Sequence, residues 1–122
     1  MEDEEIISQT LYKLDGWVLD DENSDELSSA EYNKKIKSDE ILHFFKVATD
    51  YALAFTRRDE LESIPIKDTA LILWTAGLIW RKYNIRTNNQ LDETTPLGYG
   101  DSLIIQAKEM FKPYKAYAFT YY

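Results

Sequence analysis

The segment from Ile66 to Tyr83 constrains the fold of this chain more than any other part of the sequence. Its apolar side chains are spread around every side of a helix instead of following one stripe. They are concentrated at Leu71, Leu73, Trp74, Leu78, Ile79 and Trp80. A helix that is hydrophobic all round is buried all round. The sequence therefore predicts a central helix over residues 66–83, with Pro65 at its start and Asn84 as its left-handed cap.

Two further segments have the spacing of helices that would pack around this centre. Residues 39–56 carry an apolar side chain every three or four positions, and Ser38 precedes them as a good N-cap. A shorter stripe predicts a helix that opens at Asp101 or Ser102 and ends near Pro113. We therefore expect an all-α fold, a small helical bundle around a central buried helix.

The sequence divides into an N-terminal segment, residues 1–37, and a helical domain, residues 38–122. In the first part, the spacing predicts a short amphipathic helix over residues 3–14, then a polar, mobile loop. Residues 30–37 are interpreted as one further turn of helix. The second part ends in an extended tail from about residue 116.

The net negative charge of the chain comes from its N-terminal segment. The net charge is −8, but eleven acidic residues lie before residue 32 against Lys13 alone, a balance of −10. The remaining residues hold eleven acids and thirteen bases, a balance of +2. An acidic, solvated leader is the plain interpretation. A net negative chain repels phosphate backbones at long range, which counts against nucleic-acid binding.

The first candidate contact site is the polar loop 85–100. A loop of this length in a compact domain is more often functional than not. It contains several turn-forming residues, including Pro96, Gly98 and Gly100. The candidate contact residues in this loop are Arg86, Asn88, Asn89, Asp92 and Glu93.

The second candidate contact site is the aromatic tail. Its small or polar residues alternate with aromatic ones, a pattern typical of extended chain. The candidate interface residues are Tyr117, Phe119, Tyr121 and Tyr122. So much apolar area must be covered either by the body of the domain or by another subunit, and both alternatives stay open. We expect deletion of residues 116–122 to leave the fold intact and to abolish assembly.

No set of residues in the sequence assembles into a catalytic, cofactor or metal site, so we do not expect an enzyme. Cysteine is absent, and His43 is the single histidine, with no marked partner. The acidic stretch from Asp20 to Glu31 resembles a calcium loop only loosely, because Asp25 stands where that loop needs glycine. The segment Gly98-Tyr99-Gly100-Asp101 is better explained as a turn into a helix capped by Asp101 than as a phosphate loop.

The sequence predicts a soluble protein with no membrane partner. Its longest apolar stretch, from Ala70 to Trp80, is far shorter than the roughly 20 residues that span a bilayer. The N-terminus is acidic, whereas a secretory signal begins with basic residues.

An ordered series of motifs between Ile41 and Tyr114 resembles the head–tail connector, or head-completion, proteins of long-tailed bacteriophages. In the first predicted helix the motifs are Ala48, Tyr51-Ala52 and Phe55-Thr56-Arg57-Arg58. Around the central helix they are Pro65-Ile66-Lys67, Ala70, Trp74-Thr75-Ala76-Gly77, Trp80 and Tyr83-Asn84. At the last helix they are Tyr99-Gly100-Asp101, Ala107 and Pro113-Tyr114. Residues 1–37 fall outside the pattern.

The resemblance implies a structural virion protein with no enzyme activity and no cofactor. Such proteins form small helical bundles that assemble into a ring, commonly a dodecamer, beneath the portal protein at the head–tail junction. The ring extends the channel through which DNA passes and offers a docking surface to tail or stopper proteins. The implied location is the virion, with the host cytoplasm during assembly. The alternative is a small acidic adaptor or regulatory protein that binds a single protein partner.

Overall fold

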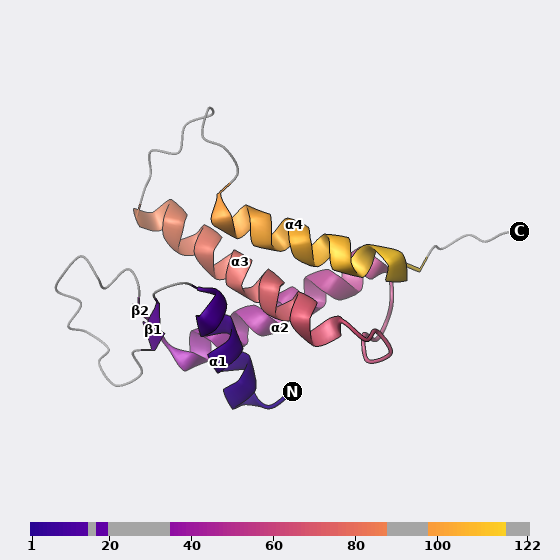
Figure 1. Cartoon of the computed structure of the whole chain (residues 1–122), viewed down its shortest axis with the longest axis horizontal. Helices are drawn as coiled ribbons and strands as arrows, with labels where there is room; N and C mark the ends of the chain where they lie inside the picture. Colours follow the sequence, from indigo (N-terminus) through magenta and orange to yellow (C-terminus); the bar gives the residue numbers. More distant parts are fainter. Residues whose placement is uncertain (15–16, 20–34, 88–97, 117–122) are drawn as a thin grey trace, which may run out of the picture.

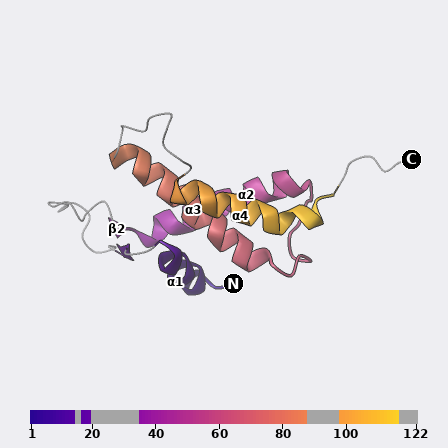
Figure 2. The ribbon, with the colours of Figure 1, turned by 45° about the horizontal axis from the view of Figure 1, so that its top comes forward.

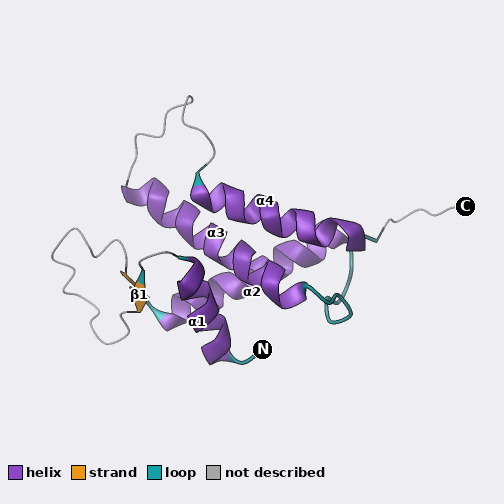
Figure 3. Cartoon of the chain, viewed as in Figure 1, coloured by secondary structure: helices purple, strands orange, loops and turns teal. Residues whose placement is uncertain are grey.

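The computed structural model describes residues 1–14, 17–19, 35–87 and 98–116, with the side chains of residues 83–87 left out. Within these residues the chain is mainly helical (Figures 1 and 3). The α-helices are α1 (Asp3–Lys13), α2 (Ser38–Thr56), α3 (Lys67–Thr87) and α4 (Tyr99–Phe111), and α4 runs on into a 3-10 helix, η2 (Lys112–Tyr114). Two short strands, β1 (Val18–Leu19) and β2 (Lys35–Ile36), complete the elements. The predicted all-α fold is confirmed.

Helix α3 is the centre of the bundle, as its composition predicts. Every residue from Ala70 to Gly77 is buried, and a run of this length passes twice around the helix. In Figure 1, α4 lies along one side of α3, α1 lies on the other side, and α2 crosses behind it. The Tyr99 hydroxyl at the start of α4 donates to the carbonyl of Lys13 at the end of α1, at 3.1 Å, so these two helices meet at one end (Figure 2 gives the turned view). Helix α3 contacts all three of its neighbours.

Helix α3 extends farther than the sequence predicts. It continues to Thr87, so the interpretation of Asn84 as its C-terminal cap is wrong. Asparagine inside a helix lowers helix stability by less than about 1 kcal/mol relative to alanine. This cost is small enough for the helix to continue through Asn84 into residues 85–87. The loop predicted over residues 85–100 therefore starts after Thr87 and ends before Tyr99.

Helix α2 confirms the predicted span, but both of its ends differ in detail. Ser38 is the first helical residue, and the extended Lys37 occupies the N-cap position in its place. At the other end Arg57 adopts the left-handed conformation, with φ 58°. The Arg57 N–H donates to the Ala54 carbonyl at 3.3 Å, and the Arg58 N–H donates to the Leu53 carbonyl at 3.2 Å. This pair of bonds forms a Schellman motif without its usual glycine.

Helix α4 begins two residues before the predicted Asp101. Gly98 is the N-cap, and Gly100 lies inside the helix and is buried, so it is not a turn glycine. Asp101 does not cap the helix: its Oδ1 lies 3.2 Å from Nε of Arg81 on α3. A first-turn carboxylate still suits the positive end of the helix dipole.

The N-terminal segment contributes α1 to the bundle, where the predicted amphipathic helix is confirmed. Ile6, Thr10 and Leu14 are buried on one face of α1, which packs against α2 and α3. Strand β1 pairs in parallel with β2, so the expectation of a helical turn up to residue 37 is wrong at Lys35 and Ile36. Backbone pairing with Val18 and Leu19 satisfies those groups in an extended conformation. Residues 30–34 lie outside the described part.

Candidate interaction surface

Four aromatic rings gather where the C-terminal halves of α2 and α4 meet α3. Trp74 of α3 lies at their centre and is only 3% exposed. Its ring centroid lies 6.1 Å from that of Phe55, 6.2 Å from that of Phe111 and 6.4 Å from that of Tyr51. Rings at these separations and tilts attract one another beyond simple area burial. The cluster therefore joins three helices, and Tyr51, at 51% exposed, carries it to the surface.

Lysine side chains lie over two of these rings, those of Phe55 and Trp74. Nζ of Lys115 lies 4.5 Å from the Phe55 ring centroid, and Nζ of Lys108 lies 6.0 Å from the same centroid. Lys108 also lies 5.9 Å from the Trp74 ring, and the exposed Lys112 follows it by one helical turn. Cations over ring faces are attracted by the ring quadrupole. We call this set the lysine–aromatic surface; its members are Tyr51, Phe55, Trp74, Lys108, Lys112 and Lys115.

The chain that leads into the predicted aromatic tail is fastened beside this surface. The Ala116 N–H donates to the Thr56 carbonyl at 2.7 Å, and Nε of Arg58 donates to the Tyr114 carbonyl at 2.7 Å. The C-terminal end of the bundle is therefore tied to the end of α2. The predicted interface residues themselves lie outside the described residues; they are Tyr117, Phe119, Tyr121 and Tyr122.

The predicted loop contacts follow the last turns of α3 in the sequence. Arg86 lies in the last turn of α3, but its side chain is outside the described part. The other candidates, Asn88, Asn89, Asp92 and Glu93, also lie outside it. The C-terminal end of α3 and the N-terminal end of α4, which flank this segment, lie at the opposite end of the α3–α4 pair from the C-terminal end of α4 (Figure 1).

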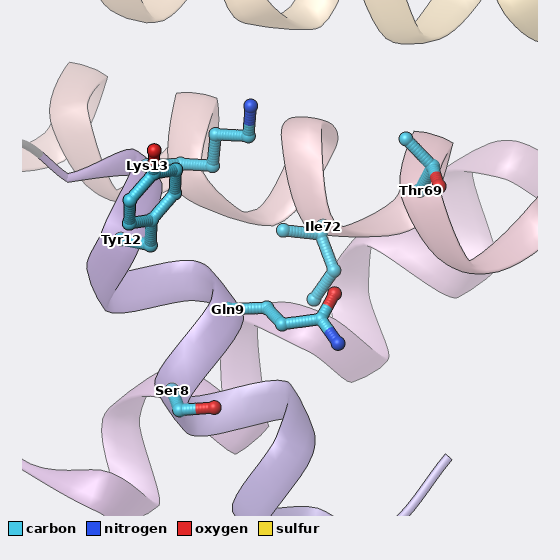
Figure 4. Close-up of a pocket in the computed structure, with 6 residues that line it drawn as sticks. All are labelled: Ser8, Gln9, Tyr12, Lys13, Thr69 and Ile72. Atoms are coloured by element: carbon cyan, nitrogen blue, oxygen red, sulfur yellow. The ribbon is translucent and has the colours of Figure 1, made fainter.

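A groove between α1 and α3 was not predicted from the sequence. Its volume is about 330 Å³, and it is lined by Ser8, Gln9, Tyr12, Lys13, Thr69 and Ile72. Figure 4 shows the Gln9 side chain extending from α1 toward Ile72 on α3. Polar groups around an apolar floor are the usual composition of a small binding site. The one sequence feature that points to this groove is Tyr12, an aromatic residue on the polar face of α1. Its side chain is 83% exposed.

Among the described residues, the displaced pKa values belong to Glu60, in the turn between α2 and α3, and to Lys67, the first residue of α3. Hydrogen bonds from the backbone N–H and hydroxyl of Ser63, both at 3.1 Å, lower the pKa of the Glu60 carboxyl. Partial burial by itself lowers the pKa of Lys67, but its contacts with Glu62 and Asp68 outweigh burial and raise it. Both shifts stabilise the charged forms and have a structural cause in the turn.

The residues considered above for catalysis, metal binding and membrane contact are only partly described by the structure. His43 is exposed on α2, and its ring packs edge-on against Phe44 at 5.5 Å between centroids. Within the described ranges, no three His, Asp or Glu side chains lie close enough together to hold a metal ion. The acidic stretch from Asp20 to Glu31 lies outside these ranges. No helix in the described part of the chain is long and apolar enough to cross a membrane.

Comparison of the chain with protein-family models, with curated proteins and with solved structures found no match.

Proposed function

We propose that this chain is a head–tail connector subunit of a long-tailed bacteriophage. The observation that carries the proposal is the position of the helix ends next to the two candidate contact segments. The chain enters the predicted loop from the C-terminal end of α3 and leaves it at the N-terminal end of α4, and the tail follows η2 at the opposite end of the α3–α4 pair (Figure 1). A connector needs this arrangement, because it must hold the portal on one side and a tail or stopper protein on the other.

The roles of the motif residues support the same proposal. Ala48 and Ala52 are fully buried, as small residues are where helices pack closely. Gly77 and Gly100 come from two separate motifs and meet where α3 crosses α4. Tyr114 accepts the hydrogen bond that fastens the start of the tail. The motifs that carry the resemblance are therefore the positions that build the bundle, which is expected if the resemblance reflects a shared fold.

In the proposed assembly, copies of the chain form a ring, commonly a dodecamer in such proteins, beneath the portal. DNA passes through the ring without specific binding, because a chain with net charge −8 offers few free cations to phosphates. The ring is part of the virion at the head–tail junction and involves no membrane, cofactor or catalytic step.

The test is binding to the portal ring of the phage or prophage that encodes this chain. Purified portal rings and the labelled chain are mixed and separated by sedimentation through a density gradient. We expect the chain to travel with the rings at about one copy per portal subunit. An unrelated phage's portal ring is the control. A chain that stays at the top of the gradient, while forming a stable one-to-one complex with a non-portal protein, would overturn the proposal.

The groove between α1 and α3 favours a second candidate, a small acidic adaptor that binds one protein partner. A peptide side chain could fit over Ile72, with hydrogen bonds to Gln9 and Thr69. The substitution Tyr12→Ala separates the two functions, because Tyr12 lines this groove and is not a member of the lysine–aromatic surface. It should weaken a single-partner complex in the adaptor case and leave portal binding unchanged in the connector case.

A further inference from the structure

Two sets of like charges on this bundle take part in no ion pair among the described residues. The ion pairs that the structure shows involve Arg58, Lys67, Arg81 and Lys82 with nearby carboxylates. None of these pairs includes the three lysines of the lysine–aromatic surface, Lys108, Lys112 and Lys115. Nor do they include any of the four acids at the start of α1.

The acidic set occupies the first turn of α1 and the residue before it. Glu2, Asp3, Glu4 and Glu5 are all exposed. Glu2 and Glu5 form a capping box, in which the Glu2 N–H donates to Oε1 of Glu5 at 3.1 Å. Asp3 and Glu4 have no such structural role and point their charges to solvent. Carboxylates are favourable at this end of a helix, so the acidic turn is a stable, preformed feature.

The basic set is preformed as well. Phe55 is half-buried, and the two lysine side chains above it converge on the same ring from α4 and from the residue after η2. Like charges that converge in this way repel one another, and a carboxylate placed between them would relieve the repulsion. Tyr51 offers exposed apolar area at the edge of the same surface.

Within one copy, no ion pair joins the two sets among the described residues. Helices α1 and α4 meet where the Tyr99 hydroxyl donates to the Lys13 carbonyl at 3.1 Å, whereas the acidic turn and the three lysines lie toward the other ends of these helices. We propose that the acidic turn of α1 in one copy binds the lysine–aromatic surface of a second copy. This contact joins two different surfaces, so repetition leads to a closed ring or to an open filament. The inference deepens the proposed function and rests on it for its biological setting.

The contact should depend strongly on salt. Each exposed ion pair contributes little and is screened within about 10 Å at 0.1 M ionic strength. The stability of the contact therefore comes from several pairs acting together and from covering Tyr51 and Phe55. We expect association at low ionic strength that weakens at least tenfold when the salt concentration is raised to about 0.5 M, because that shortens the screening length to a few Å.

The test is carbodiimide cross-linking, which joins a lysine to a carboxylate only when the two are in direct contact. An equal mixture of ¹⁴N- and ¹⁵N-labelled chain is treated both free in solution and bound to portal rings. Cross-linked peptides are then identified by mass spectrometry. We expect mixed-isotope peptides that join Lys108, Lys112 or Lys115 to the acidic turn. Absence of these peptides in both samples would overturn the proposal.

Charge reversal makes the test specific. Lys108→Glu with Lys115→Glu makes the basic surface acidic, and Asp3→Lys with Glu4→Lys makes the acidic turn basic while sparing the capping box. Each double variant alone should lose at least nine-tenths of the intermolecular cross-links. A mixture of the two variants should restore association, because each altered surface then faces an opposite charge. Failure of the mixture to associate would contradict the proposal.

The matched control is Lys37→Glu with Lys46→Glu, which makes the same change in charge at two exposed positions, the N-cap of α2 and a residue within α2. Circular dichroism verifies that every variant is folded, and the single substitutions Lys112→Glu and Asp3→Lys replace any double variant that is not. Cross-links that survive reversal, or that reach an acidic segment of another protein instead, would overturn the contact. Portal binding without these cross-links would overturn the contact alone, whereas cross-links without portal binding would overturn only the connector function.

Discussion

Gly77 of α3 and Gly100 of α4 face each other where the two helices cross, so closely that neither position has room for a side chain. A Cβ on Gly77 would lie 2.7 Å from the carbonyl oxygen of Gly100, and a Cβ on Gly100 would lie 2.8 Å from the carbonyl oxygen of Gly77. The two backbones therefore pack directly against each other. The close approach also brings the Tyr99 ring edge-on to Trp80, at 5.4 Å between centroids.

The first prediction concerns this crossing. Gly77→Ala should destabilise the fold, because the new Cβ would also lie 2.6 Å from Cγ1 of Ile104. Overpacking of this kind costs about 1–3 kcal/mol, which exceeds the roughly 1 kcal/mol that alanine gains over glycine inside a helix. We expect a net loss of about 1 kcal/mol for this variant and a similar loss for Gly100→Ala, measured by chemical denaturation.

Gly98→Ala is the matched control, because a Cβ at Gly98 would meet no atom of the described residues within 4 Å. Gly98 is an N-cap, where alanine is worse than glycine, so the control should lose only about 0.5 kcal/mol. If Gly77→Ala were as stable as the control, the close crossing of α3 and α4 would be wrong.

The same crossing illustrates what the sequence could and could not predict. The all-round apolar segment required a central helix, and the structure confirms it. Gly100 was interpreted as a turn residue, because its local context shows a glycine near a helix start and nothing of Gly77 on another helix. The prediction of Asn84 as a cap fails for a similar reason. It uses the conformational preference of asparagine alone and takes no account of the following residues, which extend α3 to Thr87.

The candidate site, too, was only partly predictable from the sequence. The unusual composition of the tail and of the loop predicts them as contact sites, but those residues lie outside the described part. The lysine–aromatic surface was not predicted. Phe55 and Lys108 look ordinary in their own helices, and their meaning appears only when α2 and α4 bring them together. Contacts between residues far apart in sequence cannot be derived from helical periodicity.

The second prediction concerns Thr10, which is fully buried on α1 and whose hydroxyl has no hydrogen-bond partner among the described residues. Thr10→Val removes a buried unsatisfied hydroxyl with little change in shape, so it should stabilise the fold by about 1 kcal/mol. Thermal denaturation measures the change. Thr75→Val is the control, because Oγ1 of Thr75 donates to the Leu71 carbonyl at 2.7 Å. The control should gain nothing or lose stability; a larger gain there would contradict the argument.

The third prediction concerns Glu60, whose pKa should lie below the ordinary value of about 4.3 for glutamate. A lowered pKa in the folded state adds stability above the ordinary pKa, and this contribution is lost as the pH falls through the lowered value. Ser63→Ala removes the hydroxyl donor and should raise the Glu60 pKa, although the backbone N–H still holds it below the ordinary value. An NMR titration measures both proteins. An unchanged pKa in Ser63→Ala would show that the hydroxyl bond does not form.

The fourth prediction concerns the tail. Deletion of residues 117–122 should leave the free energy of unfolding unchanged within about 0.5 kcal/mol, as for changes away from the core. The cut must follow Ala116, because its N–H donates to the Thr56 carbonyl and fastens the end of the bundle. We expect that the truncated chain no longer sediments together with portal rings. A truncated protein that unfolds would show instead that the tail is part of the core.

The central claim, that this chain builds a connector ring, is tested most directly by electron microscopy of the intact chain mixed with its portal rings. We expect a second ring of density beneath each portal, with the rotational symmetry of the portal. In each copy, the α3–α4 pair should run from the portal side of the ring to the tail side. Portal rings that stay bare at saturating concentrations of a folded chain would contradict it.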